Sequence, residues 1–110
     1  MTHDELIARF ESRTIAPEVF GHREHVRLAW LYLTRHGRPA AERRLLAGLR
    51  AFAAAAGKPD KFNAGLTLAW VARIDIAAAA LPPNHSFDDL LIHHPELLDR
   101  RSADEVAQTI

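Results

Sequence analysis

Cysteine is absent from this chain of 110 residues, so disulfides, thiolate nucleophiles and cysteine-ligated zinc or iron–sulfur sites are excluded. A net charge is absent too: 14 Lys and Arg residues balance 14 Asp and Glu residues, and no overall field favours nucleic acid, anionic lipid or an acidic partner. No apolar run approaches the roughly 20 residues of a membrane span, and the first five residues, MTHDE, lack the basic head and apolar stretch of a signal peptide. We therefore expect a cytoplasmic protein that neither enters a membrane nor binds nucleic acid.

β-Branched residues are sparse, and no segment alternates apolar with polar residues for long enough to predict a strand. Alanine and leucine, both good helix formers, dominate instead. The length suits one hydrophobic core and is too short for two domains. The sequence predicts an all-α fold: a single helical domain over residues 1–110, built as one compact bundle of about four main helices with a short helical C-terminal appendage.

Capping residues, glycines and prolines set the expected limits of the helices. A capping box of Thr2 and Glu5 begins the first helix, Gly37 suits a left-handed cap between the second and third, and Gly57 ends the third. Main helices are expected over residues 3–12, 22–36, 39–56 and 63–80, and appendage helices over 87–93 and 103–108, with a turn at 95–99. The helix over 63–80 is apolar around nearly its whole circumference. It is expected to be the central helix or part of a subunit interface, and we expect a homo-oligomer, at least a dimer.

Two histidines begin the second helix with the spacing HxxH. At 100° per residue, His22 and His25 fall on the flank of the stripe expected to be buried, which consists of Val26, Ala29, Trp30 and Leu33. Residues three apart on a helix are neighbours, so the pair can supply two imidazole nitrogens to one divalent transition metal ion. It can equally act as an acid/base pair. We expect both side chains to be largely buried and close to each other.

The helix over 63–80 offers a facing surface, because Asn63 and Thr67 share an apolar face with Trp70. Polar groups on such a face need partners. We predict a pocket formed by the two histidines of the HxxH pair with Asn63 and Thr67, and walled by Trp30 and Trp70. Tyr32 of the second helix is expected to line its lower end.

Each of these residues also has a simpler structural interpretation. Inward histidines without a third ligand at an evident spacing are more often hydrogen-bonding groups than metal ligands. Asn63 is a good N-cap for its helix, and Thr67 can bond back to the backbone of that helix. The tryptophans fit a hydrophobic core as well as a ligand pocket.

The segment FGHREHVRLAW at residues 20–30 resembles a family of small, uncharacterised, all-helical bacterial proteins. That family has a Thr-Leu-like element before an HxxH helix, a Gly-x-x-x-Ala-x-x-x-Leu helix and a Tyr-His-x-Thr-x-Thr-x-x-Trp segment. The counterparts here are Thr14-Ile15, the HxxH pair, Gly37 with Ala41 and Leu45, and FNAGLTLAW at residues 62–70. HPELL at residues 94–98 resembles the C-terminal part of the family, so the likeness covers most of the chain.

The chain departs from this family pattern in the last helix. Phe62 replaces the tyrosine, Asn63 the histidine and Gly65 the first threonine. The resemblance implies that, if the three histidines of the family form a metal or catalytic site, this chain lacks one ligand, because a neutral amide binds transition metals poorly.

Two functions of different classes follow from the sequence. In the first, the His22/His25 pocket binds a small molecule or a metal ion, with His-based acid/base or metal-assisted chemistry. In the second, the protein is a non-catalytic, self-associating structural or regulatory module, and its histidines are core hydrogen-bonding groups. The sequence leaves open whether the protein is an enzyme.

Overall fold

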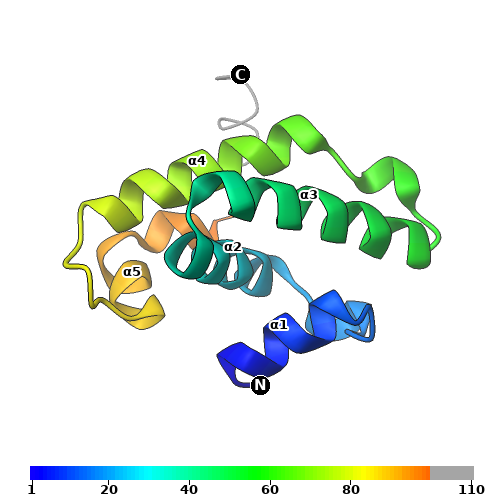
Figure 1. The fold of residues 1–110 in the computed structure, drawn as a ribbon, viewed down its shortest axis with the longest axis horizontal. Helices are drawn as coiled ribbons and strands as arrows, with labels where there is room; N and C mark the ends of the chain where they lie inside the picture. The colour runs from blue at the N-terminus through cyan, green and yellow to red at the C-terminus, as the bar shows by residue number, and fades with distance from the viewer. Residues whose placement is uncertain (100–110) are drawn as a thin grey trace.

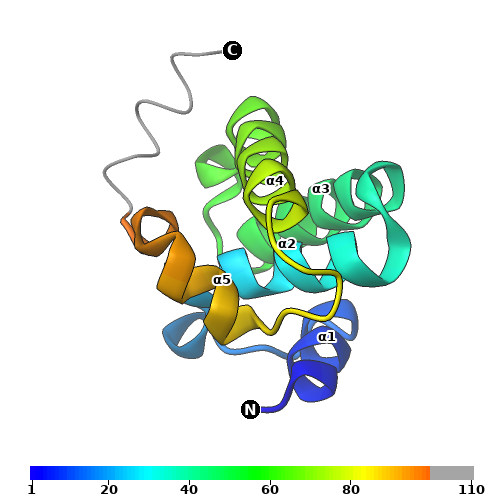
Figure 2. The same cartoon turned by 90° about the vertical axis from the view of Figure 1, so that its left-hand side faces the viewer.

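The structure is a computed structural model that describes residues 1–99, and within that range every regular element is a helix. Figure 1 shows α3 and α4 side by side, with α2 against both of them and α1 on the opposite side of α2. Figure 2 shows α5 and the last short helix beside α2, on the side away from α3. The elements are α1 (His3–Glu11), η1 (Pro17–Val19), α2 (His22–His36), α3 (Arg38–Ala55), η2 (Pro59–Lys61), α4 (Ala64–Ala79), α5 (Phe87–His93) and η3 (Pro95–Leu98). The predicted all-α bundle is confirmed; the helix expected over 103–108 lies outside the described residues.

Local capping chemistry sets the helix ends. The backbone N–H of Glu5 donates to Thr2 Oγ1 at 3.1 Å, and the Glu5 carboxylate accepts from the Thr2 backbone, as in the predicted capping box. Gly37 has φ +83° and is the single residue between α2 and α3, while Gly57 after α3 has φ +74°. Both positions are in the region that glycine adopts without steric cost.

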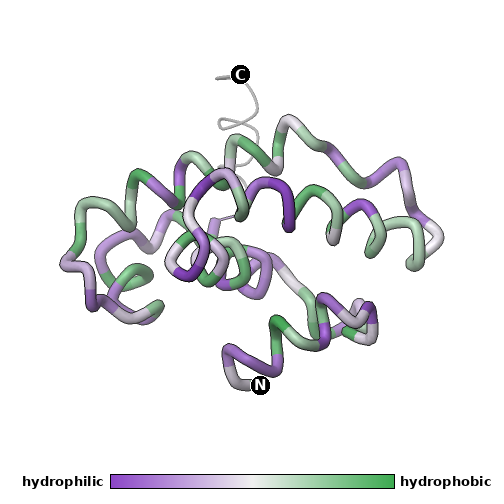
Figure 3. The backbone as a smooth tube through the Cα atoms, in the orientation of Figure 1, coloured by the Kyte–Doolittle hydropathy of each residue, from purple (hydrophilic) through white to green (hydrophobic). Residues whose placement is uncertain are grey.

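The central helix is α2, and the expectation that the helix over 63–80 would be central is wrong. Six consecutive residues of α2, from Leu28 to Leu33, are buried because α1, α3, α4 and η3 all pack against this helix. In α4 only Val71, Ile74 and Ala77 are buried, and Ile76 is 71% exposed. Much of the apolar character of α4 (Figure 3) comes from alanine, whose small side chain loses little by facing water.

Helices α1 and α3 approach each other closely at Gly48. A Cβ atom at this position would lie 2.3 Å from two ring carbons of Phe10, a buried residue of α1. Glycine in the middle of α3 therefore makes room for an aromatic ring of the core. None of the helices in residues 1–99 combines the length and apolar character needed to cross a membrane.

Candidate functional site

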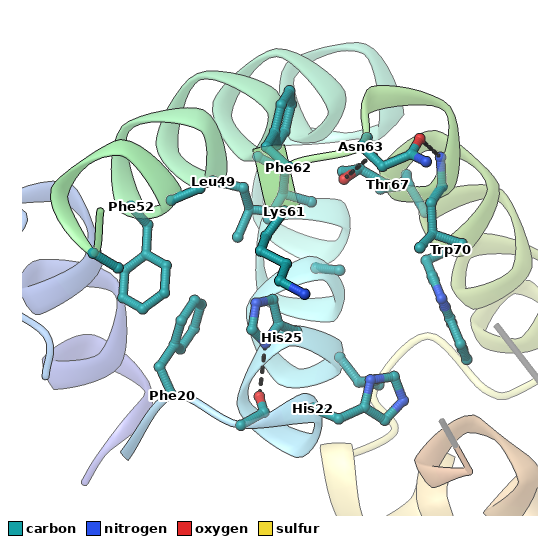
Figure 4. A pocket seen from close by; sticks show the side chains of 18 of the residues that line it. Phe20, His22, His25, Leu49, Phe52, Lys61, Phe62, Asn63, Thr67 and Trp70 are labelled. Atoms are coloured by element: carbon teal, nitrogen blue, oxygen red, sulfur yellow. Dashed lines mark hydrogen bonds between the residues drawn. The ribbon is translucent and has the colours of Figure 1, made fainter. Parts of the chain in front are cut away.

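A cavity of about 600 Å³ lies between the N-terminal half of α2, the C-terminal half of α3, η2 and α4 (Figure 4). Its deepest lining is buried, with Val26, Leu45, Val71 and Ile74 each at most 2% exposed. Phenylalanine, leucine and tryptophan side chains also line it: Phe20, Leu49, Phe52, Phe62, Leu66 and Trp70. The lining residues Lys58, Lys61 and Asn63 are exposed and mark the mouth. The cavity is therefore apolar at its base and polar where it opens to water.

His22 connects α2 to both α4 and the C-terminal helix η3. Its Nε2 lies 2.8 Å from the carbonyl oxygen of Leu97, and because a carbonyl only accepts, Nε2 is the nitrogen that carries the proton. Its ring meets the Trp70 ring edge-on, with the centroids 4.9 Å apart. His22 is half-buried, and its ring is held in place by partners on two other elements.

His25 is held by the residue that begins its own helix. Its Nδ1 lies 2.7 Å from the carbonyl oxygen of Gly21, the N-cap of α2, so Nδ1 donates to that oxygen. The ring stacks on Phe20 with the centroids 4.1 Å apart. In the neutral ring Nε2 then carries a lone pair, and Figure 4 shows this imidazole and the Lys61 side chain pointing toward each other.

Both histidines line the same cavity, but they bond to different backbone carbonyls: His22 to that of Leu97 and His25 to that of Gly21. The expectation that both would be largely buried is wrong. Both are half-buried, because they lie in the first turn of α2 next to the exposed Gly21. In the part of the chain that the structure describes, no three His, Asp or Glu side chains come together as ligands for a metal ion. The arrangement thus supplies two oriented imidazoles and no third ligand of these types.

Asn63 and Thr67 line the cavity and also serve their own helix. Asn63 Oδ1 accepts from the backbone N–H of Leu66 at 2.9 Å, which caps α4, and Thr67 Oγ1 donates to the Asn63 carbonyl at 3.0 Å. The side-chain amide nitrogen of Asn63 makes no hydrogen bond to any of residues 1–99. It is a donor that can serve a bound molecule.

Trp30 and Tyr32 do not line the cavity, and the prediction that they do is wrong. The Trp30 indole N–H points to the segment before α5, where it donates to His85 Nε2 at 3.0 Å. The Tyr32 hydroxyl donates to Glu11 Oε2 at 2.7 Å on the α1 side. The α2 residues that line the cavity are His22, His25, Val26 and Ala29. The polar atoms of the two aromatic residues find partners on other faces of the same helix.

Sequence reasoning missed the lysines at the mouth. The chain contains two lysines against twelve arginines, and both lysines, Lys58 and Lys61, line this cavity. Neither forms an ion pair with a carboxylate of residues 1–99, and none of the lining residues among these is acidic. The unequal use of lysine and arginine was a signal available in the composition.

Comparison with models of known protein families, with curated proteins and with solved structures finds no match for this chain.

Proposed function

We propose that the protein binds a small organic molecule in the cavity between α2, α3 and α4. The observation that carries this proposal is the combination of an apolar base with polar groups converging at the mouth, in a cavity of about 600 Å³. Binding sites for small molecules typically have this composition, with volumes of roughly 300–1,000 Å³.

His25 is the group that could perform chemistry on the bound molecule. A carbonyl that accepts from Nδ1 fixes the tautomer and orients the ring, as an orienting group does for a general base. The opposite nitrogen, Nε2, would take or return the proton. His22 would position the ligand through its contact with Trp70. The family that the chain resembles has a histidine where this chain has Asn63, and we propose ligand binding without a metal ion.

Replacing one of two alanines of α3 by leucine tests the binding site. Ala53 is buried and lines the cavity, whereas Ala55 is exposed and lies outside its lining. Ala53→Leu should fill part of the space and abolish binding of fragments that shift the NMR signals of cavity residues, and Ala55→Leu should leave that binding unchanged. A fragment screen that perturbs no cavity residue of the unsubstituted protein would overturn the proposal, as would fragments that bind both variants equally.

Self-association through α4 is a second candidate function. The outer face of α4 presents Ile76 at 71% exposure, and Arg73 and Asp75 are the charged residues of this helix. A second copy of the chain would cover this apolar side chain. Light scattering should give a dimer mass for the unsubstituted protein and a monomer mass for Ile76→Glu. A monomer mass for both would exclude self-association through this face.

A further inference from the structure

We infer that the molecule bound in the cavity is an amphiphilic monocarboxylate, an apolar body with one carboxylate at its end. This inference rests on the binding function proposed above and specifies the chemistry of its ligand. Its carboxylate would lie at the mouth between the Lys61 ammonium and the Asn63 amide, and its apolar body would extend toward the base.

The ionisable side chains of the lining all have the same sign of charge when ionised. The titratable side chains that line the cavity are Lys58, Lys61, His22 and His25, all bases, and no acidic side chain of residues 1–99 joins them. Five arginines outside the cavity differ, since Arg9, Arg23, Arg35, Arg38 and Arg44 each lie within 4.0 Å of a carboxylate oxygen. At the mouth, Lys58 and Lys61 form no ion pair with a carboxylate of residues 1–99, and no acidic side chain of these residues lines the cavity beside them. An anionic group supplies the missing counter-charge, whereas a cationic ligand would be repelled.

The lining of the cavity changes from polar at the mouth to apolar at the base. The exposed lining residues include Lys58, Lys61 and Asn63, and the most deeply buried ones are aliphatic. A ligand charged at both ends would place one charge against Leu45 and Ile74, where burial of an unpaired charge is costly. A ligand with one polar end matches the gradient.

Hydrogen-bond donors from two residues, Lys61 and Asn63, lie at the mouth of the cavity. Figure 4 shows the Lys61 side chain reaching into the cavity from one side, while Asn63 lies on the side of Thr67 and Trp70. An ammonium has three N–H donors and the Asn63 amide has a nitrogen with no partner in residues 1–99. The two oxygens of a carboxylate can accept from both sides at once, which a single hydroxyl oxygen does less well.

Three probes with the same chain and different head groups test the inference: octanoate, 1-octanol and octylammonium, at about pH 8, where a free carboxylic acid is ionised and a free alkylamine is protonated. Binding can be followed by the fluorescence of Trp70 in the cavity, and Trp70→Phe identifies the part of the signal that comes from Trp30 outside it. We expect octanoate to bind about tenfold more tightly than octanol, and octylammonium most weakly.

Charge-removing variants assign the effect to the mouth. Lys61→Gln should weaken octanoate binding about tenfold and leave octanol binding unchanged, since only the carboxylate uses the ammonium. Arg43→Gln removes the same charge from an exposed position of α3 outside the cavity and is the matched control. The Lys61 side chain is exposed and makes no ion pair within residues 1–99, so its substitution should leave folding intact, which circular dichroism can verify.

The outcomes separate this inference from the proposed function. Equal affinity for octanoate and octanol, both lost in Ala53→Leu, would keep the binding site and overturn the carboxylate. Preference for octylammonium, or an equal loss of octanoate binding in Lys61→Gln and Arg43→Gln, would overturn it as well. If none of the three probes binds but uncharged fragments do, the amphiphilic carboxylate is rejected and the proposed binding site remains.

Discussion

The indole N–H of Trp30 donates to His85 Nε2 at 3.0 Å, and His85 Nδ1 lies 2.6 Å from the carbonyl oxygen of Pro82. Because the carbonyl only accepts, Nδ1 carries the proton and Nε2 offers its lone pair to Trp30. Both bonds require the neutral ring in this tautomer. One histidine thus fastens the segment between α4 and α5 to the central helix α2.

Removal of this imidazole should destabilise the protein. His85→Ala leaves the buried Trp30 N–H without its acceptor, and we expect the free energy of unfolding to fall by about 1–3 kcal/mol in urea denaturation. His85→Gln keeps a side-chain acceptor and should recover part of the loss. His93→Ala on the exposed face of α5 is the control, and equal losses for His85→Ala and His93→Ala would contradict the role given to the Trp30 bond.

A methyl group at Gly48 should also destabilise the fold. The new Cβ would lie 2.3 Å from the Phe10 ring, which is 3% exposed and has little room to move. Overpacking of this kind costs about 1–3 kcal/mol, against a gain of roughly 1 kcal/mol when alanine replaces glycine in a helix. We expect a net loss in Gly48→Ala and a smaller loss when the same change is made in a Phe10→Leu background. Higher stability of Gly48→Ala would show that the two helices move apart freely.

His3 should make the stability depend on pH. Burial, followed by the positive charges of Arg27 and Arg35, lowers the pKa of His3 below 6.5, and Arg27 Nε donates to its Nδ1 at 2.8 Å. The unfolded chain therefore takes up the proton first as the pH falls. The stability due to the neutral ring is present above about pH 6.5 and is lost as the pH falls through the lowered native value.

His3→Gln should weaken this acid dependence. The melting temperature, measured across the range below about pH 6.5, should fall less steeply in this variant than in the unsubstituted protein. His93→Gln, at an exposed position, should keep the original dependence. Parallel curves for the unsubstituted protein and His3→Gln would show that this ring contributes nothing to acid sensitivity.

Tyr32 should produce the opposite dependence at alkaline pH. Burial raises the pKa of its hydroxyl, as do the hydrogen bond and charge of Glu11, so the folded state favours the neutral phenol. Its contribution is present below the reference value of about 10 and is lost as the pH rises through the native value. Tyr32→Phe should cost about 1 kcal/mol at neutral pH and should lose less stability than the unsubstituted protein on going above about pH 10, as measured by urea denaturation. Equal alkaline losses would contradict this account.

Much of the fold could be predicted because its limits are set locally. The N-cap Thr2, Gly37 with its positive φ and the N-cap Ser86 act through atoms within a few residues of themselves, so short sequence patterns carry the information. The place of each helix in the bundle depends on contacts between distant residues. The apolar composition of α4 therefore predicted a central helix at the wrong place. The helix that other helices surround is α2, although it carries several charged residues.

The same distinction applies to the site. Helical periodicity brought His22, His25, Asn63, Thr67 and Trp70 to one cavity, because it fixes which residues share a face. Periodicity could not assign Trp30, whose N–H goes to a histidine 55 residues away in the sequence. It also had no means of placing the lysines, since η2 is a connection whose path depends on how α3 and α4 pack.

The one-residue connection at Gly37 has a consequence for the order in which the chain folds. Helices α2 and α3 pack against each other, and so little chain separates them that bringing them together costs little loop-closure entropy. Contacts made across such a short separation form early, whereas those of α4 with α2 must wait for a much longer segment to close. The α2–α3 hairpin would then be the nucleus on which the later helices condense, and the wall formed by α4 would be the last part of the cavity to arrive.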